Sequence, residues 1–271
     1  LNQGFHFHSI DEEVLSVAKR LKFIQHYGVS YDATDAVAAK NLGIQVATLP
    51  GQNSRSVAEQ ALFLLLALSR RLHVGERLIR EGRIGDASCV ELEGKTLCLV
   101  GLGIIGKMMV KMAHGLSMDV IGVRKDPTNS DVEGLGINKV FGTDQLHEAL
   151  GMADFTILLV PLTEETHDII DAGAFKAMKR TGMLINMSRG PNVSLIALEE
   201  ALKNDEISGF GSDVYWTEPA DPNDALFHDE RVVISPHLGG SSIECIERTI
   251  DQLKANLLRF EKNEPLHNVV N

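Results

Sequence analysis

The chain has 271 residues, and its 26 Lys and Arg against 37 Asp and Glu give a formal net charge of −11. This acidic balance argues against nucleic acid or an anionic membrane as a partner, because no basic excess is present to neutralise phosphates. The apolar runs fall far short of the about 20 residues that a membrane-spanning helix needs. Three cysteines without paired or metal-ligand spacing fit a reducing, cytoplasmic compartment.

The N-terminal part of the chain predicts short strands and helices in alternation. Strands are expected at residues 5–8, 21–26 and 44–47, with helices at 11–20 and 35–42. This is fewer strands than a self-standing doubly wound domain usually has, so we expect a first domain that is incomplete at its N-terminus.

Two histidines alternate with phenylalanines in the first expected strand. His6 and His8 would share one face of that strand and could ligate a metal. The sequence offers no further ligands nearby, so strand-edge histidines are the favoured interpretation and no metal site is predicted.

A helix that is apolar nearly all round is predicted at residues 58–73, with Ser54 or Ser56 as its cap and helical continuation over residues 72–83. Such a helix must be buried between layers or against another subunit. The sequence alone leaves both alternatives open.

Residues 96–124 predict a strand, a glycine turn, a helix and a second strand. Gly101, Gly103 and Gly106 have G-x-G-x-x-G spacing, with Ile104 and Ile105 completing the turn. The first glycine permits a tight turn, the second lets the backbone approach a pyrophosphate, and the third lets the helix pack closely on the strand. Because the helix N-terminus would point at that phosphate, the stretch predicts a dinucleotide site.

The alternation of strands and helices continues to residue 234. Strands are expected at 139–141, 154–160, 183–186, 207–212 and 232–234, with helices at 143–150, 172–178 and 194–203. This pattern predicts a doubly wound parallel sheet of the Rossmann type, whose ligands bind beyond the carboxyl ends of the strands. Charged residues are common in loops, but four chemically useful ones follow these strands: Arg189, Asp213, Glu218 and His237.

These segments resemble the D-isomer-specific 2-hydroxyacid dehydrogenase family. The matching motifs are G-L-G-I-I-G at 101–106, P-L-T at 161–163, I-N-M-S-R-G at 185–190, D-V-Y-W-T-E-P at 213–219 and S-P-H-L-G-G at 235–240. The resemblance implies a dinucleotide-binding domain at 55–239 and a smaller flavodoxin-like substrate domain formed by 1–54 and 240–271, its N-terminal part missing. It also implies a nicotinamide cofactor, a small 2-hydroxy or 2-keto acid as substrate, and a homodimer built on the apolar helix.

The chemistry of 2-keto acid reduction suits three of these side chains. Arg189 can hold a carboxylate through two parallel hydrogen bonds. His237 is the natural proton donor, since the ordinary pKa of histidine, about 6.5, lies near neutral pH. The resemblance gives Glu218 the role of orienting the imidazole, and Asp213 that of a hydrogen bond to the nicotinamide end of the cofactor.

The resemblance implies further contacts with substrate and cofactor. Backbone N–H groups of Val29 and Ser30 would hold the substrate carboxylate, although Ser30 stands where the family usually has glycine. Asn53 could supplement this binding or could instead cap its own loop. The remaining expected cofactor contacts are Pro161, Thr166, Ser188, His237 and Gly239.

The end of the second strand bears on the choice of cofactor. NAD-specific members have an acidic residue there for the ribose hydroxyls. Here Arg124 and Lys125 take that place, and two cations suit the 2′-phosphate of NADP. The alternative is that both reach solvent while Asp126 serves the ribose. We therefore predict a preference for NADP, with NAD possible.

A second function class stays open at this stage. Non-catalytic relatives of the corepressor type keep most of the same residues and sense a nucleotide while binding a partner. The net charge of −11 and the lack of a nuclear signal favour an enzyme.

Overall fold

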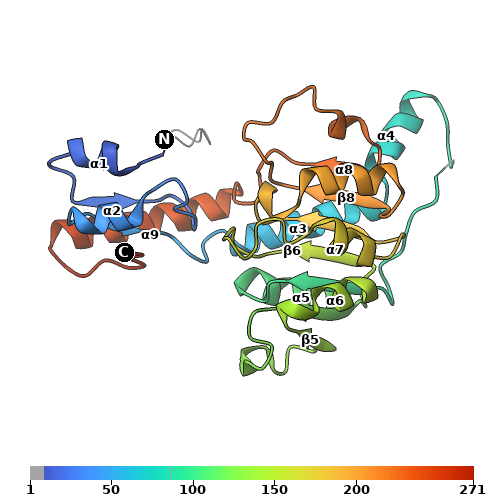
Figure 1. Cartoon of the computed structure of the whole chain (residues 1–271), viewed down its shortest axis with the longest axis horizontal. Coiled ribbons are helices and arrows are strands. Elements are labelled where there is room, and N and C mark those ends of the chain that lie inside the picture. The colour runs from blue at the N-terminus through green and yellow to red at the C-terminus, as the bar shows by residue number, and fades with distance from the viewer. Residues whose placement is uncertain (1–8, 86) are drawn as a thin grey trace. The chain divides into compact units, whose positions relative to one another are not determined.

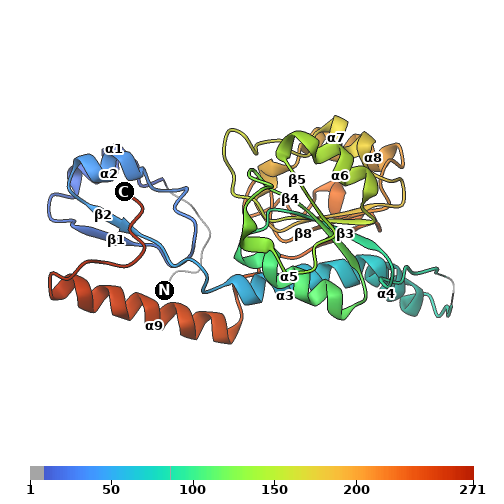
Figure 2. The same ribbon diagram turned by 90° about the horizontal axis from the view of Figure 1, so that it is seen from below.

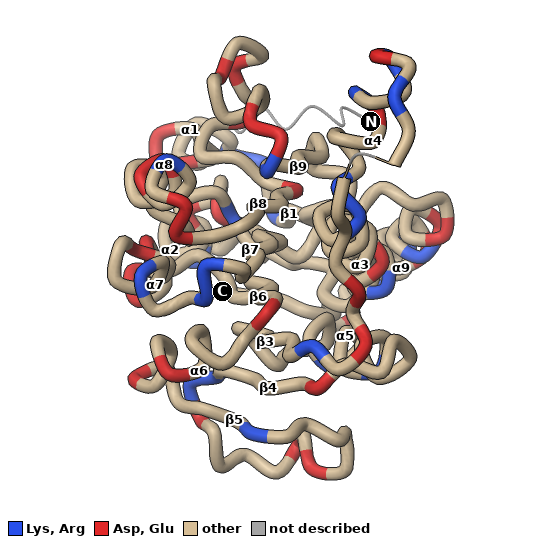
Figure 3. The backbone as a smooth tube through the Cα atoms, turned by 90° about the vertical axis from the view of Figure 1, so that its right-hand side faces the viewer, with Lys and Arg blue, Asp and Glu red and all other residues tan. Residues whose placement is uncertain are grey.

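A computed structural model describes residues 9–85 and 87–271, so the expected strand at 5–8, with His6 and His8, lies outside the described residues. The chain divides into two compact units. The smaller unit comprises Leu1–Ser56 and Gly240–Asn271, and the larger unit comprises Val57–Gly239. Figure 3 shows acidic and basic residues interspersed along the backbone of both.

The larger unit contains a seven-stranded parallel sheet with the order β5-β4-β3-β6-β7-β8-β9 (Figure 1). Its strands are β3 (Thr96–Val100), β4 (Asp119–Val123), β5 (Lys139–Phe141), β6 (Phe155–Leu158), β7 (Met183–Asn186), β8 (Gly209–Ser212) and β9 (Val232–Ile234). From β3 the chain moves outward to β5, then returns to β6 on the other side of β3 and moves outward again. The carboxyl ends of β3 and β6 therefore form the topological switch point, where such sheets bind their ligands. The predicted Rossmann-type fold is confirmed.

Helices cover both faces of this sheet. They are α3 (Ser54–Ser69), α4 (Leu72–Arg80), α5 (Ile104–Gly115), α6 (Leu146–Met152), α7 (Ala172–Ala177) and α8 (Leu195–Lys203). Helices α6, α7 and α8 lie on one face and α3 and α5 on the other (Figure 2). Successive strand residues point to opposite faces of the sheet. Cys98 and Val100 therefore pack in the hydrophobic core beneath α6, α7 and α8, and Leu97 and Leu99 pack in the core beneath α3 and α5.

The long apolar helix ends earlier than predicted. It ends at Ser69, because Arg71 adopts a left-handed backbone (φ 52°) that separates α3 from α4. One face of α3 is buried on the sheet through Leu64 and Leu65, whereas Phe63 and Leu66 on another face are 46% and 37% exposed. Burial between layers therefore accounts for only part of the apolar surface of this helix.

The smaller unit is built around two short parallel strands, β1 (Phe23–Gln25) and β2 (Gln45–Ala47). Its helices are α1 (Glu12–Val17), α2 (Ala36–Asn41) and α9 (Ile243–Glu261). The sequence analysis did not predict α9, although Ser242 caps it by accepting a hydrogen bond from the Cys245 N–H (3.2 Å). The Asn256 amide on α9 donates to the side-chain oxygen of Gln25 (2.7 Å), which ties this helix to β1.

Among the helices of the described residues, none has the length and apolar character needed to cross a membrane. The same residues contain no group of three or more His, Cys, Asp or Glu side chains placed to hold a metal ion.

Candidate functional site

The glycine turn lies between β3 and α5, at the switch point of the sheet. Gly101 has a φ of 109°, and a Cβ added there would lie 2.6 Å from the Leu159 carbonyl oxygen. A Cβ on Gly106 would lie 2.4 Å from the Gly101 carbonyl oxygen, so glycine is required at both positions. A Cβ on Gly103 would meet nothing within 4 Å, and no side chain caps the α5 N-terminus that follows. Open space before a helix N-terminus fits a pyrophosphate group.

The loops after β6 and β7 carry three of the expected cofactor contacts. The Ser188 hydroxyl is buried and accepts a hydrogen bond from the Val160 N–H (2.9 Å). The Thr166 hydroxyl donates to the Pro161 carbonyl oxygen (2.6 Å). Ser188 thus ties the loop after β7 to the loop after β6, and Thr166 fixes the loop after β6.

Charged residues gather after β4. Arg124 donates to one Asp131 oxygen (2.5 Å), and Lys107 donates to the other (2.6 Å). Lys125 instead pairs with Glu165 (2.9 Å) and is 80% exposed. Lys107 and Asp131 were not predicted as site residues, although a lysine directly after the third glycine was an available signal.

Asp126 is engaged within its own turn. It accepts hydrogen bonds from the Thr128 hydroxyl (2.7 Å) and the Thr128 N–H (3.0 Å). These bonds, with the nearby charge of Arg124, lower the pKa of Asp126.

His237 and Glu218 form a close pair after β9 and β8. The His237 Nδ1 lies 2.8 Å from one Glu218 carboxylate oxygen and 3.0 Å from the other. One of these oxygens also accepts the Tyr215 N–H (3.2 Å). Burial alone would raise the pKa of Glu218, but the hydrogen bond from His237 and the charges of His237 and Arg189 outweigh it, and the pKa is lowered.

Arg189 follows β7 in a loop with defined hydrogen bonds. Its Nη1 donates to the Ser188 carbonyl oxygen (2.8 Å), and its backbone N–H donates to the Asn192 side chain (3.0 Å). A Cβ on Gly190 would lie only 2.1 Å from the Tyr215 carbonyl carbon. The Arg189 loop therefore packs backbone to backbone on the loop that leads to Glu218.

Asp213 supports the segment that carries His237. It is 2% exposed and accepts hydrogen bonds from the Leu238 N–H (2.9 Å), the Gly239 N–H (2.7 Å) and the Ser235 hydroxyl. Burial raises the pKa of Asp213 although these bonds oppose the rise. His237 itself has a left-handed backbone (φ 52°), which a non-glycine residue keeps only when its surroundings impose it. Ser235, which stands in the S-P-H-L-G-G motif but was given no role from the sequence, belongs to these surroundings.

The three expected carboxylate contacts lie in the smaller unit. The backbone N–H groups of Val29 and Ser30 have no hydrogen-bond partner within the described residues. The side-chain oxygen of Asn53 is buried and likewise lacks a partner there. All three residues thus retain unused hydrogen-bonding capacity.

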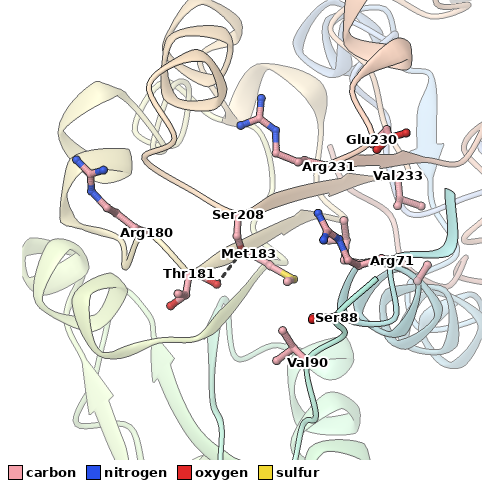
Figure 4. Close-up of a pocket in the computed structure, with 12 residues that line it drawn as sticks. Arg71, Ser88, Val90, Arg180, Thr181, Met183, Ser208, Glu230, Arg231 and Val233 are labelled. Atoms are coloured by element: carbon pink, nitrogen blue, oxygen red, sulfur yellow. Dashed lines mark hydrogen bonds between the residues drawn. The ribbon is translucent and has the colours of Figure 1, made fainter. Parts of the chain in front are cut away.

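A cavity of about 260 Å³ lies at the opposite, amino edge of β7, β8 and β9 (Figure 4). Two of the polar side chains in its wall are paired with the protein. The Ser208 hydroxyl donates to the Thr181 carbonyl oxygen (2.8 Å) (Figure 4), and Arg231 pairs with Asp229 (2.6 Å). No residue expected at the site lines this cavity. The carboxyl edge, rather than this cavity, is the candidate site.

A glycine turn at the switch point, with an arginine and a histidine–glutamate pair at the same sheet edge, defines an oxidoreductase that uses a nicotinamide dinucleotide. The comparisons with known proteins agree. Residues 62–239 match the family model "D-isomer specific 2-hydroxyacid dehydrogenase, NAD binding domain". The chain is 36% identical over 271 residues to a glyoxylate reductase of Korarchaeum cryptofilum, covering 97% of this chain and 80% of the relative.

Solved structures give the same result. The TT0316 protein from Thermus thermophilus superposes with a TM-score of 0.88 at 35% identity, covering 97% of this chain and 83% of that one. An acyclic imino acid reductase (Bsp5), in complex with NADPH and D-Arg, superposes with a TM-score of 0.87 at 27% identity and the same coverage. The chain belongs to the D-isomer-specific 2-hydroxyacid dehydrogenase family, and the predictions of the family and of an NAD(P)-dependent dehydrogenase are confirmed.

Proposed function

We propose that this dehydrogenase reduces a small 2-keto acid of the glyoxylate or hydroxypyruvate type and prefers NADPH. The observation that carries the proposal is the 2.8 Å pair between His237 Nδ1 and Glu218, on the same sheet edge as Arg189. The similarity to a glyoxylate reductase supports the substrate class.

The bound nicotinamide supplies the hydride for the keto carbon. Arg189 binds the substrate carboxylate and polarises the keto group. His237 donates a proton from Nε2 to the keto oxygen, so that hydride and proton together convert the C=O group to CH–OH. Glu218 keeps a proton on Nδ1, which fixes the tautomer, and stabilises the imidazolium before the transfer.

The remaining site residues have supporting roles in this proposal. The N–H groups of Val29 and Ser30, with the Asn53 side chain, bind the substrate carboxylate. Gly101, Gly103 and Gly106 with the α5 N-terminus hold the pyrophosphate. Asp213 positions the His237 segment and bonds the nicotinamide end of the cofactor.

The preference for NADPH rests on Arg124, which directly follows β4. NAD-specific members have an acidic residue at this position. The imino acid reductase, which has the same fold, was solved in complex with NADPH, and this supports the choice of cofactor.

We also propose that the protein is a homodimer built on α3. Phe63 and Leu66 on this helix are exposed apolar side chains, and burying them against a second copy would be favourable.

A substrate panel tests the proposed reaction. We expect the full chain to oxidise NADPH with glyoxylate or hydroxypyruvate, with a higher kcat/KM than for NADH. Arg189→Ala should raise KM and lower kcat, whereas Arg180→Ala, which removes an exposed arginine at the other sheet edge, should change neither. Absence of turnover with every 2-keto acid would contradict the proposal and favour a non-catalytic nucleotide sensor. Equal or better kcat/KM with NADH would contradict the cofactor preference.

A further inference from the structure

Three charged side chains meet at the carboxyl end of β4. Asp131, in a short 3₁₀ turn (Ser130–Val132), accepts from Arg124 with one oxygen and from Lys107 with the other. Lys107 lies in the first turn of α5, directly after the third glycine of the turn. The side chains of Arg124 and Lys107 are 17% and 32% exposed, so both cations are partly withdrawn from solvent.

The carboxylate between them is fully ionised near neutral pH. The hydrogen bonds from Lys107 and Arg124 and their positive charges lower the pKa of Asp131 below its ordinary value. Two cations and one anion leave one net positive charge on these three side chains, and Asp126 adds a negative charge near Arg124. The cluster is therefore an anion site that already contains one anion, supplied by the protein.

Lys125 does not take part in this cluster. Its ammonium group pairs with Glu165 and is mostly exposed. The second cation beside Arg124 is thus Lys107, which the sequence motif alone did not single out.

We infer that Lys107 is the second ligand of the adenosine 2′-phosphate and that Asp131 restrains the preference for NADP(H) by competing with that phosphate for both cations. The inference rests on the proposed use of NADPH. A 2′-phosphate brings about −1.5 to −2 charges and must displace or repel Asp131, whereas the 2′-hydroxyl of NAD leaves both ion pairs intact. Asp131 therefore keeps NAD(H) as a usable second cofactor.

Direct binding to the full chain tests this without turnover. The probes are adenosine 2′,5′-bisphosphate and 5′-AMP, measured by calorimetry at low salt. We expect Lys107→Met to weaken the bisphosphate about five- to tenfold and Asp131→Asn to strengthen it by a similar factor, since each variant alters one partly exposed charge interaction with the phosphate. Binding of 5′-AMP should change less than about twofold. Lys111→Met, one turn further along α5, removes the same charge from an exposed position and is the matched control.

The outcomes separate the inference from the cofactor proposal. If the unmodified protein binds the bisphosphate no tighter than 5′-AMP and Arg124→Gln changes nothing, the NADPH preference itself is wrong. If Arg124→Gln weakens the bisphosphate while Lys107→Met and Asp131→Asn behave like Lys111→Met, only the inference is overturned. It is also overturned if Asp131→Asn weakens 5′-AMP, since Asp131 would then serve the ribose.

Discussion

Asp154 and Asp213 lie at opposite edges of the same parallel sheet, and their pKa values are shifted in opposite directions. At the amino edge, Asp154 accepts hydrogen bonds from the Thr96 N–H (2.9 Å) and from Lys179 (2.9 Å), and its pKa is lowered although burial opposes the change. At the carboxyl edge, Asp213 is buried and its pKa is raised. A carboxylate whose charged form is stabilised by the fold contributes to the stability of the protein. A buried carboxylate whose charged form is disfavoured indicates a functional site.

The backbone at the carboxyl edge is closely packed around the candidate site. The carboxyl edge holds His237 at a φ of 52° and forces the loops of Gly190 and Tyr215 into backbone contact. At the amino edge, Asp154 simply ties the start of β3 to Lys179. Substitution of the His237 side chain at the first edge should therefore change the reaction and not the stability, whereas substitution of Asp154 at the second edge should change the stability and not the reaction.

The largest effect is expected for His237→Gln. The amide cannot donate a proton to the keto oxygen, so kcat for glyoxylate reduction should fall about 10²- to 10⁴-fold. The urea midpoint of unfolding should stay close to that of the unmodified protein, since the side chain is only partly buried. A kcat within tenfold of the unmodified protein would show that another group supplies the proton.

Gly190→Ala should give the next largest effect. The added methyl would lie 2.1 Å from the Tyr215 carbonyl carbon, so the two loops must move apart. We expect a loss of about 2–3 kcal/mol in the free energy of unfolding, together with a lower kcat as Arg189 moves away from Glu218. Gly115→Ala is the control, because a Cβ there meets nothing within 4 Å. Equal stability of the two variants would contradict the close packing of these loops.

The regular part of the fold could be predicted because its signal is local. Strands β5, β7 and β9 have the bounds expected from the sequence, since short apolar runs bounded by turn residues are typical of strands in a parallel sheet. Because the strands are parallel, Arg189 after β7 and His237 after β9 could be placed at the carboxyl edge from the order of the strands alone.

What the sequence could not show depends on long-range pairing. The hydrogen bonds of Asp213 to Ser235 and Gly239 join residues that are distant in the chain. Lys107, and not Lys125, is the cation beside Arg124 because both Lys107 and Arg124 pair with Asp131. The pattern of apolar residues in the sequence does not predict the position of Asp131. The left-handed Arg71, which ends α3, interrupts a pattern that favours a longer helix.

A smaller effect, on pH dependence, is expected for Glu218→Gln. The lowered pKa of Glu218 keeps its carboxylate charged as the pH falls through the range in which an imidazole protonates. That negative charge lies beside the imidazole, so its removal should move the acidic limb of the rate profile for 2-hydroxy acid oxidation to lower pH. An acidic limb that stays in place would contradict the role of Glu218.

The smallest effect is expected at the amino edge, for Asp154→Asn. The variant loses the charge-assisted contact with Lys179, which is worth about 1 kcal/mol for a partly exposed pair, while kcat should not change. Because the pKa of Asp154 is lowered from its ordinary 3.8, its contribution is present above pH 3.8 and is lost as the pH falls through the lower folded value. Urea unfolding at pH 7 and at progressively lower pH should show the unmodified protein and the variant converging in acid. A difference in stability that persists at the lowest pH would show that the charge of Asp154 is not its cause. A lower kcat in the variant would show that Asp154 also affects the reaction at the other edge of the sheet.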